Sequence, residues 1–168
     1  NKKASIAIVN IINKNNNKKY QVKVNDTLEF LTKSSKIYRQ NLNTNIIAIT
    51  GSCGKTTLKE LLGNSLKQVS KVGISPKSYN NKYGVPLSLF NLNQKDDYGV
   101  LEIGMDKKGE IDYLSKIVQP DVSIITNISY AHAKNFRNLK QIALAKSEII
   151  NNTKDNGFIV LNADDNFF

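Results

Sequence analysis

Short apolar runs alternate with segments of helical periodicity from residue 46 onward. Runs of about four apolar residues predict buried strands, and apolar positions three or four residues apart predict amphipathic helices. Strands joined by helical crossovers are typical of a parallel sheet with helices on both faces. We therefore predict an α/β fold with a doubly wound, mostly parallel sheet. The expected strands are Ile46–Thr50, Lys71–Ile74, Tyr98–Ile103, Val122–Asn127 and Phe158–Asn162, and the expected helices are Thr56–Val69, Pro86–Leu92, Gly109–Val118 and Asn138–Asn151.

The first 45 residues follow a different pattern. Residues 4–12 and 20–24 are predicted strands, separated by a polar Asn/Lys turn. The Asp-Thr-Leu-Glu sequence at 26–29 has the form of a capping box and predicts a helix that continues to about Gln40. We expect a partial α/β domain here, with a boundary at 41–45. The apolar face of its helix should consist of Leu28, Leu31 and Ile37.

Composition narrows the class of protein. The single Cys and single His exclude a disulfide framework and a Cys/His zinc site. The apolar runs are too short to span a membrane, so we expect a cytoplasmic protein without membrane insertion. The net charge of +10 raises the possibility of a nucleic-acid partner, but Lys outnumbers Arg by 22 to 2 and the excess lies mostly in residues 1–45. We therefore expect no nucleic-acid partner.

The strongest chemical motif is Thr50-Gly51-Ser52-Cys53-Gly54-Lys55-Thr56-Thr57, which lies between a predicted strand and a predicted helix. Glycines allow backbone N–H groups to converge on phosphate oxygens, and the N-terminus of a helix favours negative charge. Lys55 could reach the β- and γ-phosphates of ATP, and the hydroxyl of Thr56 could bind Mg²⁺. Residues 51–57 are therefore the candidate nucleotide site. Cys53 is expected to fill space in the loop.

Further motifs follow the phosphate loop in order. They are Asn80-Asn81-Lys82-Tyr83-Gly84-Val85-Pro86, Leu101-Glu102-Ile103-Gly104 with Gly109-Glu110-Ile111, Thr126-Asn127 with His132 and Phe136, Ala145-Lys146-Ser147-Glu148-Ile149, and Asn162-Ala163-Asp164-Asp165. This set, with the short loop form Thr-Gly-x-x-Gly-Lys-Thr, resembles the Mur ligases of cell-wall precursor synthesis. The resemblance covers about residues 22–165.

The resemblance implies a division into domains. Residues 1–45 would be the end of an N-terminal domain that binds the UDP-linked substrate. Residues 46–168 would be an incomplete central ATP-binding domain of the P-loop type. The C-terminal ligase domain would lie outside this chain.

The resemblance also implies roles for individual residues. Glu102, His132 and a carbamoylated Lys146 would be metal ligands beside Thr56, and Lys55, Lys146 and His132 would be catalytic. Asn127 would orient its loop or reach the phosphates, and Tyr79, Asn80 and Asn81 would line the path of the peptide substrate. From the residues alone, Lys146 could equally be a solvated lysine, and the two asparagines could simply form turns.

The implied reaction is the ADP-forming ligation of D-alanyl-D-alanine to UDP-N-acetylmuramoyl-tripeptide through an acyl phosphate, with ATP and Mg²⁺ as cofactors. We expect a monomer that acts on these small molecules. Three alternatives stay open: a ligase of the same superfamily that adds one amino acid, or glutamate to folate; a nucleotide-binding module that switches without catalysis; and a basic nucleic-acid binder.

Overall fold

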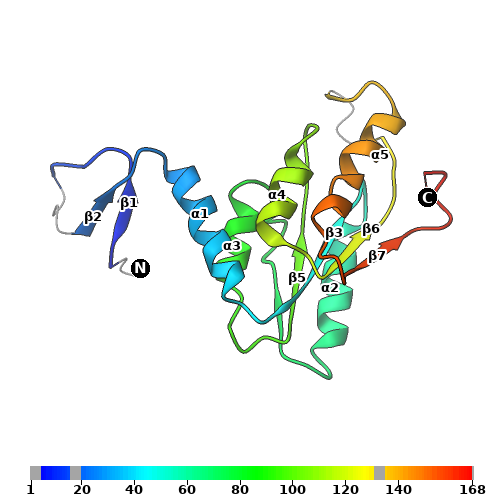
Figure 1. Ribbon diagram of the computed structural model, residues 1–168, viewed down its shortest axis with the longest axis horizontal. Coiled ribbons are helices and arrows are strands. Elements are labelled where there is room, and N and C mark those ends of the chain that lie inside the picture. The colour runs from blue at the N-terminus through cyan, green and yellow to red at the C-terminus, as the bar shows by residue number, and fades with distance from the viewer. Residues whose placement is uncertain (1–4, 16–19, 131–134, 168) are drawn as a thin grey trace.

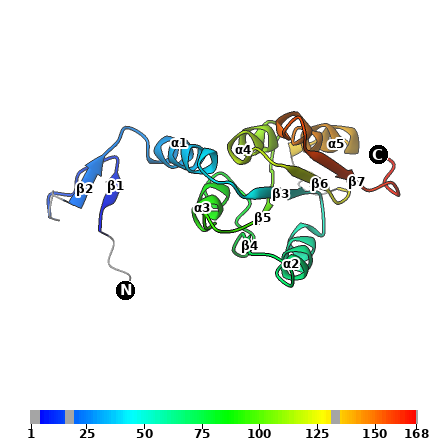
Figure 2. The same cartoon turned by 60° about the horizontal axis from the view of Figure 1, so that its bottom comes forward.

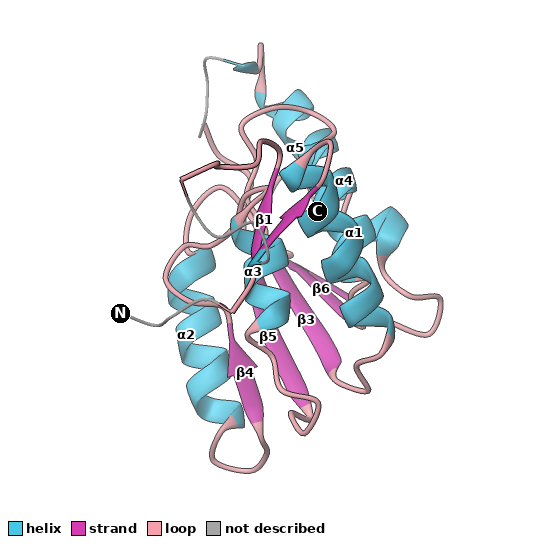
Figure 3. Ribbon diagram, turned by 90° about the vertical axis from the view of Figure 1, so that its left-hand side faces the viewer, coloured by secondary structure: helices cyan, strands magenta, loops and turns pink. Residues whose placement is uncertain are grey.

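A five-stranded parallel sheet forms the centre of the computed structural model, which describes residues 5–15, 20–130 and 135–167. Its strand order is β4-β5-β3-β6-β7, and Figure 3 shows β4, β5, β3 and β6 side by side. The predicted doubly wound parallel sheet is confirmed, and the strands lie within a few residues of their expected positions. They are β3 (Asn45–Thr50), β4 (Val72–Ile74), β5 (Tyr98–Glu102), β6 (Val122–Ile125) and β7 (Phe158–Leu161).

Helices cover both faces of this sheet. Alternate residues of β3 point to opposite sides, so Ile47 and Ile49 pack toward α2 (Lys55–Leu66), whereas Ile46 and Ala48 pack toward the other helices. Figure 2 shows α2 on one side of the sheet, with α4 and α5 on the other. The helices of this second layer are α3 (Gly84–Phe90), α4 (Glu110–Val118) and α5 (Leu139–Ser147).

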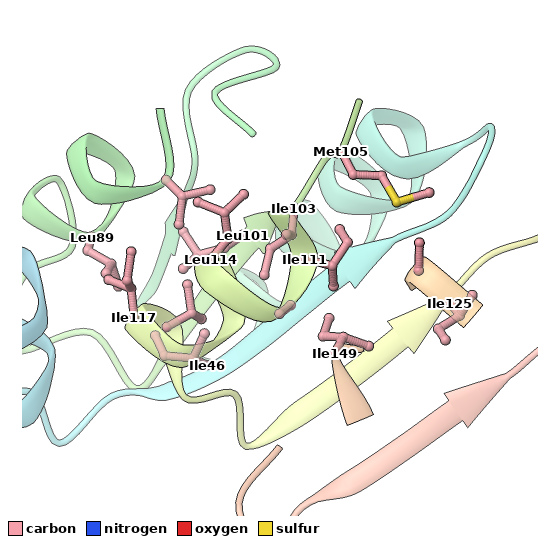
Figure 4. Close-up of a cluster of buried hydrophobic side chains, with 14 of the residues drawn as sticks. Ile46, Leu89, Leu101, Ile103, Met105, Ile111, Leu114, Ile117, Ile125 and Ile149 are labelled. Carbon is pink, nitrogen blue, oxygen red and sulfur yellow. The ribbon is translucent and has the colours of Figure 1, made fainter. Parts of the chain in front are cut away.

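The larger part of the core lies under this second layer. Ile103, Ile111 and Ile149 are completely buried there, between the sheet and α4 and α5 (Figure 4). Burial of one such side chain contributes about 1.5–3 kcal/mol. This packing fixes the carboxyl ends of β3 and β5 relative to α5, which positions the loops that follow these strands.

Helix α5 ends earlier than predicted. It stops at Ser147, whose hydroxyl donates to the carbonyl of Leu144, and a short 3-10 helix, η3 (Ile150–Asn152), follows. The side chains of Asn152 and Thr153 bond back to carbonyls of the preceding turn. Such local side-chain bonds compete with the regular helix and account for its early end.

The N-terminal region consists of a two-stranded parallel pair, β1 (Ala7–Val9) and β2 (Gln21–Lys23), followed by α1 (Thr27–Gln40). Figure 1 shows β1 and β2 set apart from the main sheet, with α1 between them. Asp26 caps α1 as expected, since its carboxylate accepts from the backbone N–H groups of Leu28 and Glu29. The pair is too small to bury its side chains alone, and Val22 is 45% exposed.

Helix α1 packs closely against the central unit. The Tyr38 and Phe90 rings lie 5.3 Å apart, and the Tyr38 hydroxyl donates to the carbonyl of Leu92. The buried Arg39 donates to the Val118 carbonyl and forms an ion pair of 3.0 Å with Asp121. Helix α1 therefore packs as part of the central unit. The domain boundary at residues 41–45 stays a proposal.

One expectation for α1 is wrong. Ile37 is 60% exposed and does not share the packed face with Leu28 and Leu31, whereas Ser35 and Arg39 are buried on that face. The C-terminal end of α4 offers carbonyl acceptors to Arg39, so a charged side chain can be buried on the packed face in place of the expected Ile37. Among the described helices, none combines the length and apolar character that a membrane crossing requires.

Candidate active site

The phosphate loop joins the carboxyl end of β3 to the first turn of α2. Two glycines in it have positive φ angles, Gly51 at 147° and Gly54 at 79°. A Cβ atom on Gly51 would lie 1.9 Å from the hydroxyl oxygen of Thr126, so no larger residue fits there. The loop leads into the N-terminus of a twelve-residue helix that has no capping side chain, and the backbone N–H groups of such a first turn are suited to phosphate.

The segment after β6 holds this loop in place. Asn127 accepts from the backbone N–H of Ser52 through its carbonyl and from that of Cys53 through its side chain, both at 3.0 Å. The hydroxyl of Thr126 donates to the carbonyl of Cys53 at 2.6 Å. Of the two roles expected for Asn127, the geometry matches orientation of the loop.

Lys55 begins α2 and folds back over the loop. Its ammonium donates to the carbonyls of Gly51 at 2.9 Å and Ser52 at 3.4 Å. The neighbouring Thr57 is exposed in the first turn, and Cys53 is exposed in the loop. Lys55 therefore lies where an ammonium could exchange loop carbonyls for phosphate oxygens.

Glu102 ends β5 next to the phosphate loop. One oxygen of its carboxylate accepts from the hydroxyl of Thr56, and the other accepts from the side-chain amide of Asn80, both at 2.7 Å. Glu102 is only 1% exposed, and these two bonds orient a carboxylate that would otherwise be costly to bury. Two of the four predicted metal ligands, Thr56 and Glu102, thus lie in direct contact.

The oxygen atoms of Thr56 and Glu102 are suitable ligands for Mg²⁺. No three described His, Cys, Asp or Glu side chains lie together as a metal-binding group, so an all-protein cage is not available in the part of the chain that the structure covers. Mg²⁺ does not need one, because it usually takes one or two protein oxygens together with waters and substrate phosphates. Thr56 and Glu102, at the mouth of a phosphate loop, supply that kind of donor set.

Residues 75–81 run alongside this pair. The hydroxyl of Ser75 accepts from the backbone N–H of Glu102 at 3.4 Å, and the carbonyl of Asn80 accepts from that of Gly104 at 2.8 Å. The side chain of Asn81 accepts from the N–H groups of Tyr83 and Gly84 and so forms the turn before α3. Tyr79 is 41% exposed.

A cleft of about 700 Å³ opens beside these residues. Its lining combines Lys55, Asn80 and Asn81 with Leu28 of α1 and the loop before α4. Tyr79 is not among the residues that line it. The structure therefore brings two of the three predicted substrate residues to the same cleft as the phosphate-loop lysine.

Lys146 is buried in α5. It is 2% exposed, and burial, reinforced by the positive charge of Lys55, lowers its pKa to about 8. Its side-chain ammonium donates no hydrogen bond to any of the described residues. Because Lys55 and Cys53 both affect its pKa, this buried amine lies near the phosphate loop and away from solvent. Of the two alternatives for Lys146, the solvated lysine is therefore excluded.

The sequence analysis assigned no role to two residues, Glu148 and Lys59, that hold elements near the site in place. The carboxylate of Glu148 accepts from the N–H groups of Gly109 and Asp112 and caps α4, which has no capping side chain of its own. Lys59 lies on α2 with its side chain completely buried beneath residues 75–77. Lys59 lies in no motif, and the motif that contains Glu148 does not indicate this capping role, because both side chains bond to residues far away in the sequence. His132 lies outside the described residues, so its predicted role as a metal ligand stays a prediction.

Comparison with known proteins agrees with this geometry. A family model described as the Mur ligase middle domain matches residues 49–168. The chain belongs to the Mur ligase family. The resemblance inferred from the ordered motifs is thereby confirmed, and a Mur ligase central domain accounts for the five-stranded sheet and the phosphate loop at its edge.

The relatives of this chain include D-alanyl-D-alanine ligases of the Mur ligase family. The UDP-N-acetylmuramoyl-tripeptide–D-alanyl-D-alanine ligase of Buchnera aphidicola (subsp. Acyrthosiphon pisum) is 42% identical over 130 residues, which are 77% of this chain and 29% of that protein. A crystal structure of MurF from Acinetobacter baumannii is 39% identical with a TM-score of 0.89, covering 97% of this chain and 36% of that one.

A third relative carries a nucleotide. MurF from Thermotoga maritima, solved in complex with ADP, is 32% identical with a TM-score of 0.84, covering 95% of this chain and 37% of that one. The chain spans about a third of the length of the relatives that it matches.

Proposed function

We propose that the protein is an ATP- and Mg²⁺-dependent, ADP-forming ligase of peptidoglycan precursor synthesis. It adds D-alanyl-D-alanine to UDP-N-acetylmuramoyl-tripeptide through an acyl phosphate. We further propose that it acts in the cytoplasm as a monomer, with residues 1–45 contributing to the UDP-substrate domain and 46–168 to the ATP-binding domain.

The observation that carries this proposal is the hydrogen bond between Asn80 and Glu102. Glu102 also contacts Thr56, so this one carboxylate joins the candidate metal site to the Asn-Asn-x-x-Gly-Val-Pro segment. That segment distinguishes the D-alanyl-D-alanine ligases from the sister ligases that share the phosphate loop. The identity to ligases of that name supports the same choice.

The proposed chemistry brings two anions together, a peptide carboxylate and the γ-phosphate of ATP. Lys55 and the N–H groups of the loop would bind the β- and γ-phosphates and neutralise charge as the phosphoryl group moves. Thr56 and Glu102 would hold Mg²⁺, which supplies further charge neutralisation when bound. Asn80 and Asn81 would orient the peptide along the cleft, so that its terminal carboxylate meets the phosphate in line.

Lys146 is suited to carbamoylation. With a pKa of about 8, a larger fraction of this amine is neutral at pH 7 than for an ordinary lysine. The lone pair of the neutral nitrogen would form a bond to the carbon of CO₂ and a proton would leave to solvent, which converts a buried cation into a carbamate anion. That anion would face the positive charge of Lys55 and could serve as a further metal ligand.

ADP release tests the proposed function. The complete product of the reading frame is supplied with Mg²⁺-ATP and UDP-N-acetylmuramoyl-tripeptide, and the amine is either D-alanyl-D-alanine or a single amino acid. We expect release with the dipeptide and less than a hundredth of that rate with single amino acids. Lys55→Ala, which removes the phosphate-loop ammonium, should abolish release.

The other outcomes of this assay discriminate among the alternatives. Release with a single amino acid would assign the protein to a sister ligase with the same mechanism. Nucleotide binding without any amine-dependent release would favour a switch module and overturn the proposal.

A further inference from the structure

A second buried lysine lies one helical turn beyond Lys55. The side chain of Lys59 has no exposed surface, yet its ammonium has three polar partners. It donates hydrogen bonds to the carbonyl of Ser75 at 2.8 Å and to the carbonyl of Lys77, and it forms an ion pair of 3.1 Å with the Glu60 carboxylate. The buried charge of Lys59 is therefore paired within the protein.

The backbone that Lys59 holds leads directly to the candidate metal site. Ser75 accepts from the backbone N–H of Glu102, and Asn80, five residues later, donates to the Glu102 carboxylate. Between them, the hydroxyl of Ser78 lies 3.4 Å from that of Thr56. Residues 75–80 thus contact two of the predicted metal ligands, Thr56 and Glu102.

Lys77 shows that this segment is held against its own preference. Its φ of 47° is left-handed, a conformation that costs a residue with a Cβ atom about 1 kcal/mol. Its side chain is exposed, whereas its carbonyl accepts from the buried Lys59. An observed strained residue beside a site indicates a surrounding structure that enforces it. Here the enforcing contact is the Lys59 ammonium.

We propose that Lys59 is a positioning residue, which anchors residues 75–80 to helix α2 and thereby sets the Glu102 carboxylate beside Thr56. The effect of this anchoring on metal and peptide binding rests on the proposed function. The anchored segment also carries Asn80 and Asn81 toward the cleft. Nucleotide contacts at the start of α2 and peptide contacts at residues 80–81 then belong to one rigid unit. A lysine that merely stabilised the fold would not affect the metal site in particular.

Hydrogen exchange provides a test that needs neither metal nor activity. In the complete product of the reading frame, Lys59→Met removes the ammonium and keeps the apolar stem, and Lys67→Met is the control, because Lys67 is exposed near the end of the same helix. The amides of Gly84 and Gly104, which bond to Asn81 and Asn80, should exchange at least tenfold faster in Lys59→Met. The Ile103 amide, bonded to β3, should keep its rate in both variants.

Nucleotide titration tests the consequence for the metal site. ADP is titrated with and without Mg²⁺ into the wild type and both variants. Without Mg²⁺, we expect the ADP affinity of Lys59→Met to be within twofold of the wild-type value. The increase in ADP affinity on adding Mg²⁺ should be at least fivefold smaller in Lys59→Met than in the wild type. Lys67→Met should match the wild type in both measurements. An unchanged exchange rate at Gly104 together with an unchanged Mg²⁺ gain would overturn the inference.

The remaining outcomes are also decisive. If the wild type binds no nucleotide, the proposed function fails, and the exchange rates alone decide the role of Lys59. If Lys59→Met does not fold, Asn80→Ala cuts the same connection at a half-buried position. The Mg²⁺ gain of Asn80→Ala should then fall at least fivefold, and an unchanged gain would overturn the anchoring role.

Discussion

Helices α2 and α5 each bury one lysine near the phosphate loop, and the two lysines differ in what surrounds them. Lys59 of α2 is 0% exposed, donates to two carbonyls and forms an ion pair with a carboxylate. Lys146 of α5 is 2% exposed, donates to no described residue and faces another cation, Lys55. The same residue type, buried to a similar degree, thus has acceptors in one region, whereas in the other it has none among the described residues.

The difference separates a structural charge from a reactive one. A buried ammonium with a full set of acceptors stays where its partners hold it, and removal of that ammonium leaves those partners unsatisfied. A buried ammonium beside another cation loses its proton more readily, since burial and the charge of Lys55 lower the pKa of Lys146, and a neutral amine is a nucleophile. Burial alone therefore does not assign a function to a lysine.

The largest expected effect is on turnover. Lys146→Met in the complete product of the reading frame should lower the rate of ADP release at least a thousandfold, because Met cannot form a carbamate. A thousandfold loss corresponds to about 4 kcal/mol in the barrier. Lys146→Ala should be partly rescued by a short carboxylate, such as acetate or propionate, that occupies the place of the carbamate.

The control for this variant is Lys140→Met, which removes an exposed lysine from the same helix and should keep the wild-type rate. An active enzyme whose Lys146 carries no added mass in intact-protein spectrometry would contradict the carbamate. Turnover by Lys146→Met at the wild-type rate would remove Lys146 from the mechanism.

Features that depend on residues close together in the chain could be predicted from the sequence. The phosphate loop is a local strand, glycine turn and helix start, so its elements could be predicted from residues 46–57, and the order of strands and helices followed from local periodicity. The contact of Thr56 with Glu102 was also predictable in outline, because the carboxyl ends of parallel strands meet at one edge.

Features that depend on tertiary packing could not be predicted in this way. Nothing in the local pattern around Lys59 distinguishes it from the exposed Lys67 of the same helix, since its acceptors are backbone carbonyls 16 and 18 residues away. Glu148 caps a helix 36 to 39 residues earlier, and the burial of Arg39 depends on carbonyls about 80 residues later. Such bonds leave no signature in spacing.

The second expected effect is on stability. Lys59→Met should lower the free energy of unfolding by about 3 kcal/mol, because the buried carbonyls at Ser75 and Lys77 lose their donor and each unsatisfied group costs about 1–3 kcal/mol. Urea unfolding at pH 7 measures this loss, and Lys67→Met should stay within about 0.5 kcal/mol of the wild type. A Lys59→Met variant as stable as the wild type would show that these contacts contribute little and would weaken the contrast between the two lysines.

The last effect has the opposite sign. Lys146→Met should raise the free energy of unfolding below pH 8 by at most about 3 kcal/mol, because it removes a charge that the fold disfavours and the pKa of Lys146 falls from 10.5 to about 8, at about 1.4 kcal/mol per pKa unit. The pKa of Lys146 is about 8 in the folded protein against 10.5 for the free side chain, so between these values the unfolded state binds more protons and wild-type stability rises with pH. The advantage of Lys146→Met should therefore shrink from pH 8 and disappear near pH 10.5.

Urea unfolding at pH 7, 8, 9 and 10 measures this convergence, in buffer free of bicarbonate so that Lys146 stays unmodified. Lys140→Met should differ from the wild type by a constant amount at each pH, because its ammonium is exposed in both states. If the difference between Lys146→Met and the wild type is equally constant, the Lys146 amine does not change its proton occupancy on folding over this range. Lys146 would then resemble Lys59 in being satisfied, and the distinction between the two buried lysines would have to come from a partner that the described residues do not include.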